Sequence, residues 1–425
     1  MRRALAWLWV GVLLGAVCAA SSLAAAETAE PGQPGAKVFP SAEQTLHEQY
    51  RRVISGPGVN EIDSYAGFTG FVGWAGVTTT KTGALLVTFS SGYWHASPAT
   101  PLAKREKDLL KQYGIAEVDA PRGGRAHITR SDDGGLTWSK PQVLIDTPSD
   151  DRSPSVAQLA DGTLVCSFFT YPDTATGIIR STDDGRTWEQ TPRLLREPMA
   201  WTATDGPPHQ LKDGSVVVAT YGGKTLSEGE KSNEVLFRST DRGATWTHLA
   251  TIEAPFGLDE PDLAQLTDGR LVTISRREGA LAWSGDNGKT WTKPVPLPFK
   301  MYDPWLLTLK DGTLVCLHGS YTPGHGGLRA ILSPDGGKAW HSAGPDYGFS
   351  VDPSVYGYSR GVQLDDGSVY IAYQFNGGHH TADLKTQKIL GLRFRVKEGC
   401  SGIELLPAPG SPADLEHRNQ QRSTR

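Results

Sequence analysis

Residues 131–138 read SDDGGLTW, and their pattern, Ser-x-Asp-x-Gly-x-Thr-Trp, recurs along the chain. The five copies, of which the last is degenerate, begin at Ser131, Ser181, Ser239, Ser284 and Ser333. In such a box the Ser and Asp side chains can cap local backbone amides, Gly accepts a positive φ, and Trp places an aromatic ring in the core beside the turn. The spacings of 45 to 58 residues between boxes indicate a chain built from repeated units.

A second pattern, out of phase with the boxes, is an Asp-Gly or Thr-Gly turn followed by alternating apolar residues, as in ADGTLVCSF and KDGSVVVAT. Its turn glycines are Gly83, Gly162, Gly214, Gly269, Gly312 and Gly367. Six hairpins and five boxes predict six repeats, the last without a box. Because a four-stranded unit can bury its faces only against neighbouring units, we predict an all-β fold, a six-bladed β-propeller of four-stranded antiparallel blades.

The two ends of a propeller must meet for the ring to close. We expect the outer strand of the last blade to come from residues 52–55, ahead of the first blade, and a further strand from residues 388–396. The predicted organisation is a signal peptide over 1–26, a lead-in over 27–50, the propeller over 51–400 and a C-terminal tail over 401–425. Blade one carries the one large insertion, residues 91–125, in which LAKREKDLLKQY has helical spacing. Long insertions of this kind build the rims of sites.

The first 26 residues have the organisation of a secretory signal peptide: two arginines, a long apolar run and the small-residue ending SSLAAA. Ala24 and Ala26 supply the cleavage pattern, so the mature chain is predicted to start near Glu27. The alternative is an uncleaved N-terminal anchor, since the apolar run approaches the roughly 17 residues that can span a bilayer. We predict a secreted or periplasmic protein without a membrane span after cleavage, and we expect a monomer.

Charge and cysteine content limit the classes of partner, metal and cofactor that the chain is expected to bind. The chain has 42 basic and 46 acidic residues among 425, a formal charge of −4, so it would repel an extended phosphate backbone on average. Nucleic acid is therefore not an expected partner. Cys166, Cys316 and Cys400 are predicted to be buried free thiols. No Cys/His spacing points to a metal site and no motif points to an organic cofactor, so neither is predicted.

The boxes resemble the Asp-box (BNR) repeats of the sialidase superfamily over roughly residues 65–396. The resemblance implies the propeller fold more strongly than it implies a reaction, because in that superfamily the boxes lie on the periphery, away from the active site. It also implies that site residues stand at the start of each innermost strand, a few positions before the Asp-Gly turn. In this chain that position holds Trp74, Arg152, the stretch 201–205, Glu260, Asp303 and Tyr358.

Two segments resemble the superfamily's site at three positions. YGYSRGVQLDDG resembles the segment with the tyrosine nucleophile, which implies that role for Tyr358, and DEPDLAQLTDGRLVTISRR resembles the segment with its activating glutamate, which implies that role for Glu260. The latter segment also implies a substrate-binding arginine at Arg276 or Arg277. A neutral phenol with an adjacent base suits a sugar whose anomeric carbon carries a carboxylate, because a carboxylate nucleophile would be repelled.

The general acid of such enzymes comes from the blade-one loop shortly before the first box. Asp119 is the candidate here, and Glu117 is the nearest alternative carboxylate.

The chain departs from the superfamily where the substrate carboxylate would be held. Gly73-Trp74-Ala75 stands where the signature Arg-Ile-Pro is expected, and the position of the third clamp arginine falls near His325. Three arginines on one carboxylate would contribute several kcal/mol of charge-assisted binding, and at most one aligns. Arg152 is a candidate for a relocated partner, while Trp74 and Trp201 offer aromatic faces that suit a sugar ring.

Three functions fit these residues. The first is a secreted glycoside hydrolase of the exo-α-sialidase type that cleaves a terminal, acidic sugar from a glycan or polysaccharide. The second is a non-catalytic propeller that binds glycans with the same aromatic and polar residues. The third is a polysaccharide lyase, in which Tyr358 or a histidine would abstract the proton next to a uronate carboxylate. In all three, Asp303 either contacts the ligand or caps a turn before Pro304.

Overall fold

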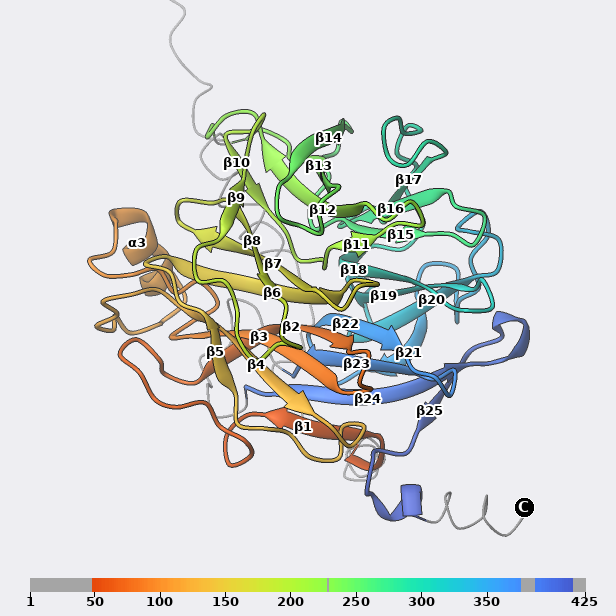
Figure 1. The fold of residues 1–425 in the computed structure, drawn as a ribbon, viewed down its shortest axis with the longest axis horizontal. Helices are drawn as coiled ribbons and strands as arrows, with labels where there is room; N and C mark the ends of the chain where they lie inside the picture. The colour runs from red at the N-terminus through yellow and green to blue at the C-terminus, as the bar shows by residue number, and fades with distance from the viewer. Residues whose placement is uncertain (1–47, 228, 376–386, 416–425) are drawn as a thin grey trace, which may run out of the picture.

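Six antiparallel sheets, one for each predicted repeat, lie around a common axis, with β2, β6, β18 and β22 near the centre and β1, β5 and β14 towards the rim (Figure 1). The computed structural model describes residues 48–227, 229–375 and 387–415, so the predicted signal peptide lies outside the described residues. The predicted six-bladed β-propeller is therefore confirmed.

The first three blades follow the chain from their innermost strand outwards. Blade 1 contains β2 (Phe71–Thr79), β3 (Leu85–Gly92), β4 (Arg125–Ser131) and β5 (Gln142–Ile145). Blade 2 contains β6 (Asp150–Gln158), β7 (Leu164–Tyr171), β8 (Thr176–Ser181) and β9 (Arg193–Leu195). Blade 3 contains β10 (Trp201–Ala203), β11 (His209–Gln210), β12 (Val216–Gly223), β13 (Asn233–Ser239) and β14 (Thr247–Ile252). Its innermost strand is thus split into β10 and β11, both of which pair with β12.

The last three blades continue around the ring. Blade 4 contains β15 (Asp262–Gln265), β16 (Leu271–Ser275) and β17 (Ala280–Ser284). Blade 5 contains β18 (Met301–Thr308), β19 (Leu314–Ser320), β20 (Leu328–Ser333) and β21 (Phe349–Asp352). Blade 6 contains β22 (Gly357–Gln363), β23 (Val369–Gln374), β24 (Ile389–Val396), β1 (Arg51–Ser55) and β25 (Ile403–Leu406). Four strands per blade therefore describes blades 1, 2 and 5; in blade 4 a single bridge between Leu281 and Val295 stands in place of a fourth strand.

The ring closes by pairing the two ends of the propeller. β1 pairs antiparallel with β24, with Arg51 opposite Leu392 and Val53 opposite Leu390. The expected closing strand is therefore present. The segment predicted as a tail after residue 400 also contributes, because β25 pairs with β24 after the short 3₁₀ helix η2 (Glu398–Cys400). Residues 403–406 of the expected C-terminal tail, 401–425, thus belong to the sheet of blade 6.

Every Asp box forms the same turn after the third strand of its blade. In the first, Ser131 Oγ donates to Asp133 Oδ1 and accepts from the Gly135 amide, each at 2.8 Å. The Thr137 amide donates to Asp133 Oδ1 at 2.9 Å, and the Thr137 hydroxyl donates to Asp133 Oδ2. The degenerate fifth box retains the serine and amide contacts but has Ala339 in place of the threonine. Local turn chemistry therefore explains why one short pattern specifies five turns.

These hydrogen bonds predict how the fold responds to acid. Threonine hydroxyl donation, reinforced by backbone amides, lowers the pKa of Asp183, Asp241 and Asp286 to about 2, below the ordinary aspartate value of about 3.9. Because the folded-state pKa is depressed, the stability is present above about pH 4 and is lost as the pH falls through about 2. The threonines that donate to these aspartates are Thr187, Thr245 and Thr290. Replacing all three by valine should therefore move the acid unfolding midpoint to higher pH, as followed by circular dichroism. The matching threonine-to-serine variant retains the hydroxyls and should unfold like the native chain; coincident midpoints for all three proteins would contradict the prediction.

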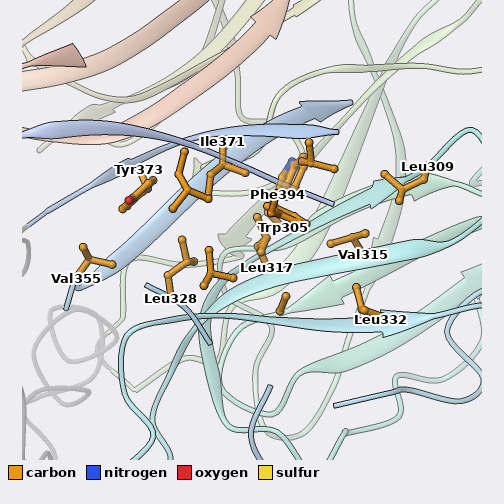
Figure 2. Packing of buried hydrophobic residues seen from close by; sticks show 14 of the residues in the cluster. Trp305, Leu309, Val315, Leu317, Leu328, Leu332, Val355, Ile371, Tyr373 and Phe394 are labelled. Carbon is orange, nitrogen blue, oxygen red and sulfur yellow. The ribbon is translucent and has the colours of Figure 1, made fainter. Parts of the chain in front are cut away.

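The apolar core lies between neighbouring blades. The largest cluster joins blades 5 and 6 and includes Trp305, Leu317, Ile371 and Phe394 (Figure 2). Trp305 is 2% exposed. It follows Asp303 by two residues on β18, and its ring packs in the interior between blades 5 and 6. Trp305 is thus a core residue rather than an aromatic face for a sugar.

The insertion in blade 1 forms the expected helix, α3 (Lys104–Gln112), at the edge of the molecule (Figure 1). The Tyr171 hydroxyl at the end of β7 donates to Glu106 Oε1 at 3.1 Å, which fixes the helix over blade 2. Within the described residues, Cys166, Cys316 and Cys400 are buried free thiols, as predicted. No helix in that same part of the chain has the length and apolar character needed to cross a membrane.

Candidate active site

The innermost strands share a backbone kink at one position. Five non-glycine residues adopt positive φ there, at 52° for Trp74, 52° for Ser153, 42° for Glu260, 44° for Asp303 and 55° for Tyr358. At four of them the pairing with the second strand is interrupted by a bulge, and Glu260 lies just before β15. Each such conformation costs roughly 1–3 kcal/mol and persists only where the surrounding structure holds it. The kinks gather these side chains, as bulges beside active sites do: four of them line one pocket, and the fifth, Glu260, is hydrogen-bonded to Tyr358.

A proline follows three of the kinked residues, and it marks the position of the kink in the sequence. Pro154, Pro261 and Pro304 come directly after Ser153, Glu260 and Asp303. Proline has no N–H to contribute to a sheet and is tolerated at bulges. The kink in blade 2 is thus centred on Ser153, one residue after the predicted Arg152.

The structure brings together Tyr358, Glu260 and Arg276. The Tyr358 hydroxyl donates to Glu260 Oε1 at 2.8 Å, and Arg276 Nη1 donates to the Tyr358 oxygen at 3.0 Å and to Glu260 Oε1. Arg276 Nη2 donates to the Tyr321 hydroxyl, and the Asp303 amide donates to Glu260 Oε2 at 2.9 Å. A phenol, its proton acceptor and a guanidinium therefore form one hydrogen-bonded group.

The electrostatics of this group keep the phenol neutral at rest. Tyr358 is 8% exposed, and burial raises its pKa well above the ordinary value, while the Arg276 charge acts in the opposite direction. Glu260 and Arg276 are also buried. A phenolate can therefore form only as its proton passes to Glu260, with Arg276 compensating the developing negative charge.

A second buried ion pair borders the group. Arg360 Nη1 and Nη2 donate to the two carboxylate oxygens of Asp303, both at 2.8 Å, and the Ser359 amide donates to Asp303 at 3.1 Å. Arg360 Nε donates to the Asp205 backbone carbonyl at 3.0 Å. The carboxylate of Asp303 is thus committed to contacts within the protein, and it links blade 5 to blade 6.

A small pocket opens between these groups. It has about 160 Å³ of empty space, counted to its open mouth, and is lined by Trp74, Ala75, Ser153, Asp205, Asp303, Tyr358 and Arg360. Much of that space lies at the open mouth, so the enclosed part of the pocket is small.

Arg152 lies behind the wall of this pocket. It is 1% exposed, with its guanidinium carbon 4.6 Å from the Trp74 ring centre and 5.1 Å from that of Phe169. Asp150 is its nearest carboxylate, at 3.8 Å from Nε. The rings of Trp74 and Tyr358 lie nearly perpendicular to each other, with their centres 6.4 Å apart. Arg152 thus supports the Trp74 ring from one side while Tyr358 meets it from another.

Besides Arg152, three predicted residues belong, within the described residues, neither to the pocket lining nor to the hydrogen-bonded group of Tyr358, Glu260 and Arg276. Arg277 is turned to the rim, where its Nε lies 3.6 Å from Asp259. Trp201 is half-buried against Tyr221, with ring centres 5.9 Å apart. Asp119 is exposed, in the loop after α3. Of the residues that sequence reasoning did not select, Arg360 and Tyr321 contribute directly to the site's hydrogen bonds.

The comparisons with known proteins agree with this architecture. A family model described as a BNR repeat-like domain matches residues 128–371. A sialidase from Bacteroides fragilis is 30% identical over 181 residues, which is 39% of this chain and 28% of the relative. A probable oligoxyloglucan-reducing end-specific xyloglucanase from Neosartorya fischeri is 28% identical over 174 residues, 33% of this chain and 20% of the relative. The matches thus span about a quarter of the length of these curated relatives.

Solved structures share the fold at low sequence identity. A protein of unknown function from Dyadobacter fermentans aligns with a TM-score of 0.60 and 21% identity, covering 84% of this chain and 99% of the other. The NanB sialidase of Streptococcus pneumoniae aligns with a TM-score of 0.58 and 12% identity, covering 84% and 73%. The Trypanosoma rangeli sialidase in complex with sialic acid aligns with a TM-score of 0.54 and 15% identity, covering 81% and 58%.

Proposed function

Because the chain belongs to the family of BNR repeat-like proteins and has the propeller of the sialidases, we propose that it is a glycoside hydrolase that removes a terminal sugar from a glycan. The observation that carries the proposal is the hydrogen-bonded group of Tyr358, Glu260 and Arg276. This tyrosine is buried at a kinked strand beside both a proton acceptor and a cation. Packing does not require that arrangement, whereas nucleophilic catalysis does.

In the proposed reaction the Tyr358 oxygen attacks the anomeric carbon while Glu260 Oε1 accepts the phenol proton. The glycosidic bond breaks, and the leaving oxygen is protonated by a carboxylic acid. Water then attacks the glycosyl–tyrosine intermediate and gives a proton to the carboxylate formed in the first step, and Glu260 returns its proton to the phenolate. Two displacements at one carbon give net retention of configuration.

An exo-acting enzyme, which takes one terminal sugar, is part of the proposal. Trp74 borders the pocket that Tyr358 also lines, and an aromatic face is a common platform for sugars. For an acidic sugar, Arg276 is the arginine of the predicted pair that stands beside Tyr358, while Arg277 faces Asp259 at the rim. Arg152 would act indirectly, through the Trp74 ring. Secretion, with a glycan or polysaccharide as the partner, remains part of the proposal.

The test is a panel of 4-methylumbelliferyl glycosides carrying N-acetylneuraminic acid, uronic acids and neutral sugars. We expect hydrolysis of one class, and a loss of about 10²- to 10⁴-fold in kcat for Glu260→Gln, the range for removal of a general base. Proton NMR of the first product should show retained configuration. Glycan-array binding without turnover would instead support a binding propeller, and an unsaturated, ultraviolet-absorbing product would support a lyase; either result overturns the proposal.

A further inference from the structure

Asp205 occupies the break in the innermost strand of blade 3. It lies between β10 and β11 and is followed by Gly206, Pro207 and Pro208, which cannot continue a regular ladder. Asp205 is 7% exposed and lines the same pocket as Tyr358. Blade 3 thus presents a carboxyl group to the pocket where the other innermost strands present kinked residues.

The other two carboxylates of this site are neutralised by arginines. Glu260 pairs with Arg276, and Asp303 pairs with Arg360. For Asp205, the described residues supply no such ion pair: the Arg360 contact reaches its backbone carbonyl rather than its carboxylate. A buried carboxyl without a counter-charge is favoured in its protonated form.

The surroundings of Asp205 reinforce this state. The titratable and charged groups that face it are Glu260, Asp303, Arg360, Tyr221 and Tyr358, from four neighbouring strands or strand ends. Burial raises the pKa of Asp205 most, the charges of Glu260 and Asp303 raise it further, and Arg360 lowers it in part. The group is therefore suited to donate a proton in the pocket that the proposed nucleophile, Tyr358, also lines.

We propose that Asp205 is the general acid of the glycosidase reaction, a role that rests on the proposed function. As the Tyr358 oxygen forms its bond to the anomeric carbon, the glycosidic C–O bond breaks and the Asp205 carboxyl transfers its proton to the leaving oxygen. In the second step the Asp205 carboxylate accepts a proton from the attacking water, and the bond to Tyr358 breaks. Asp205 thus recovers its proton, and each step is balanced.

This proposal gives the role of general acid to the buried Asp205 instead of the exposed Asp119. Asp119 is exposed in the loop after α3, whereas Asp205 borders the pocket. A proton donor must come within hydrogen-bond reach of the leaving oxygen, about 2.6–3.2 Å. Of the two aspartates, the structure puts Asp205 beside the reacting centre.

The experiment compares leaving groups of different basicity on the sugar selected by the glycoside panel. The 2,4-dinitrophenyl glycoside needs little proton donation to depart, whereas the methyl glycoside needs full donation. We expect Asp205→Asn to lose about 10²- to 10⁴-fold in kcat/KM on the methyl glycoside and far less on the dinitrophenyl glycoside. Asp205→Ala should be accelerated by sodium azide on the dinitrophenyl glycoside, because azide attacks the intermediate without a general base and yields a glycosyl azide.

Two further variants separate the possible failures. Asp119→Asn tests the alternative acid. The assignment is overturned if the loss of kcat/KM depends on the leaving group in Asp119→Asn but not in Asp205→Asn. An equal loss on both glycosides in Asp205→Asn also overturns it, because a structural defect does not distinguish leaving groups. Asp205→Glu retains the acid and should recover part of the methyl-glycoside activity, with folding checked by thermal melting. Tyr358→Phe tests the proposed function itself: wild-type rates in that variant reject the glycosidase, whatever Asp205 does.

Discussion

Replacing Tyr358 by phenylalanine is expected to reduce turnover by at least roughly 10³-fold, the scale on which loss of a covalent nucleophile is felt. The ring of Phe fills the same space, but it has no oxygen to attack the anomeric carbon and no proton to give to Glu260 Oε1, 2.8 Å away in the native chain. Glu260 keeps its pairing with Arg276 and its contact from the Asp303 amide, so its charge remains compensated. The measurement is kcat/KM on the glycoside that the panel selects, with circular dichroism and thermal melting to verify folding.

Tyr370→Phe is the matched control. Tyr370 is fully buried on β23 of the same blade, and within the described residues its hydroxyl has no hydrogen-bond partner. The same atom is removed there from a part of the blade that does not touch the pocket, so activity and stability should both be retained. Activity in Tyr358→Phe within a few-fold of the native protein would show that the phenol oxygen is not the nucleophile.

Replacing Asp303 by asparagine is expected to lower the free energy of unfolding by about 3–5 kcal/mol, the cost of breaking a buried ion pair from one side. Both side chains of the pair are buried, with exposures of 0% for Asp303 and 5% for Arg360. The substitution leaves the Arg360 guanidinium in the interior without its bidentate carboxylate. Chemical denaturation with urea measures the change.

The exposed pair of Lys310 and Asp365 provides the comparison. Its atoms lie 3.2 Å apart on the surface, where such pairs contribute about 0–1 kcal/mol. Asp365→Asn should therefore change stability by less than about 1 kcal/mol. If Asp303→Asn is no more damaging than this surface variant, the pair between blades 5 and 6 does not have the role assigned to it.

The fold could be predicted because its information is local. Each Asp box closes its own turn with contacts between residues two to four positions apart, from Ser131 to Thr137 in the first case. The same is true of the hairpins, so repetition alone gives the number of blades. The sequence also predicts four of the kinked residues, because each stands at a fixed offset from a hairpin turn: Trp74, Glu260, Asp303 and Tyr358.

The rest of the site depends on contacts between blades, which a single sequence does not display. Asp303 and Arg360 are 57 positions apart, and only the assembled ring brings them together. The choice between Arg276 and Arg277 was open because it depends on backbone conformation: Arg277 has a φ of 69°, and the chain turns it outwards. Trp305 lies only two residues after Asp303, yet its ring belongs to the core between blades 5 and 6.

The pairing of β1 with β24 has a consequence for how the protein is made. Arg51 must wait for Leu392, about 340 residues later, which takes roughly 20–70 s at ribosomal rates of about 5–20 residues per second. Contacts so distant in sequence also form slowly, because loop closure must come first. The last blade to be completed is the one that carries Tyr358 on β22. A nascent chain is therefore expected to hold Glu260 and Arg276 long before it holds their phenol, so that chemical competence arrives only when both ends of the propeller have joined.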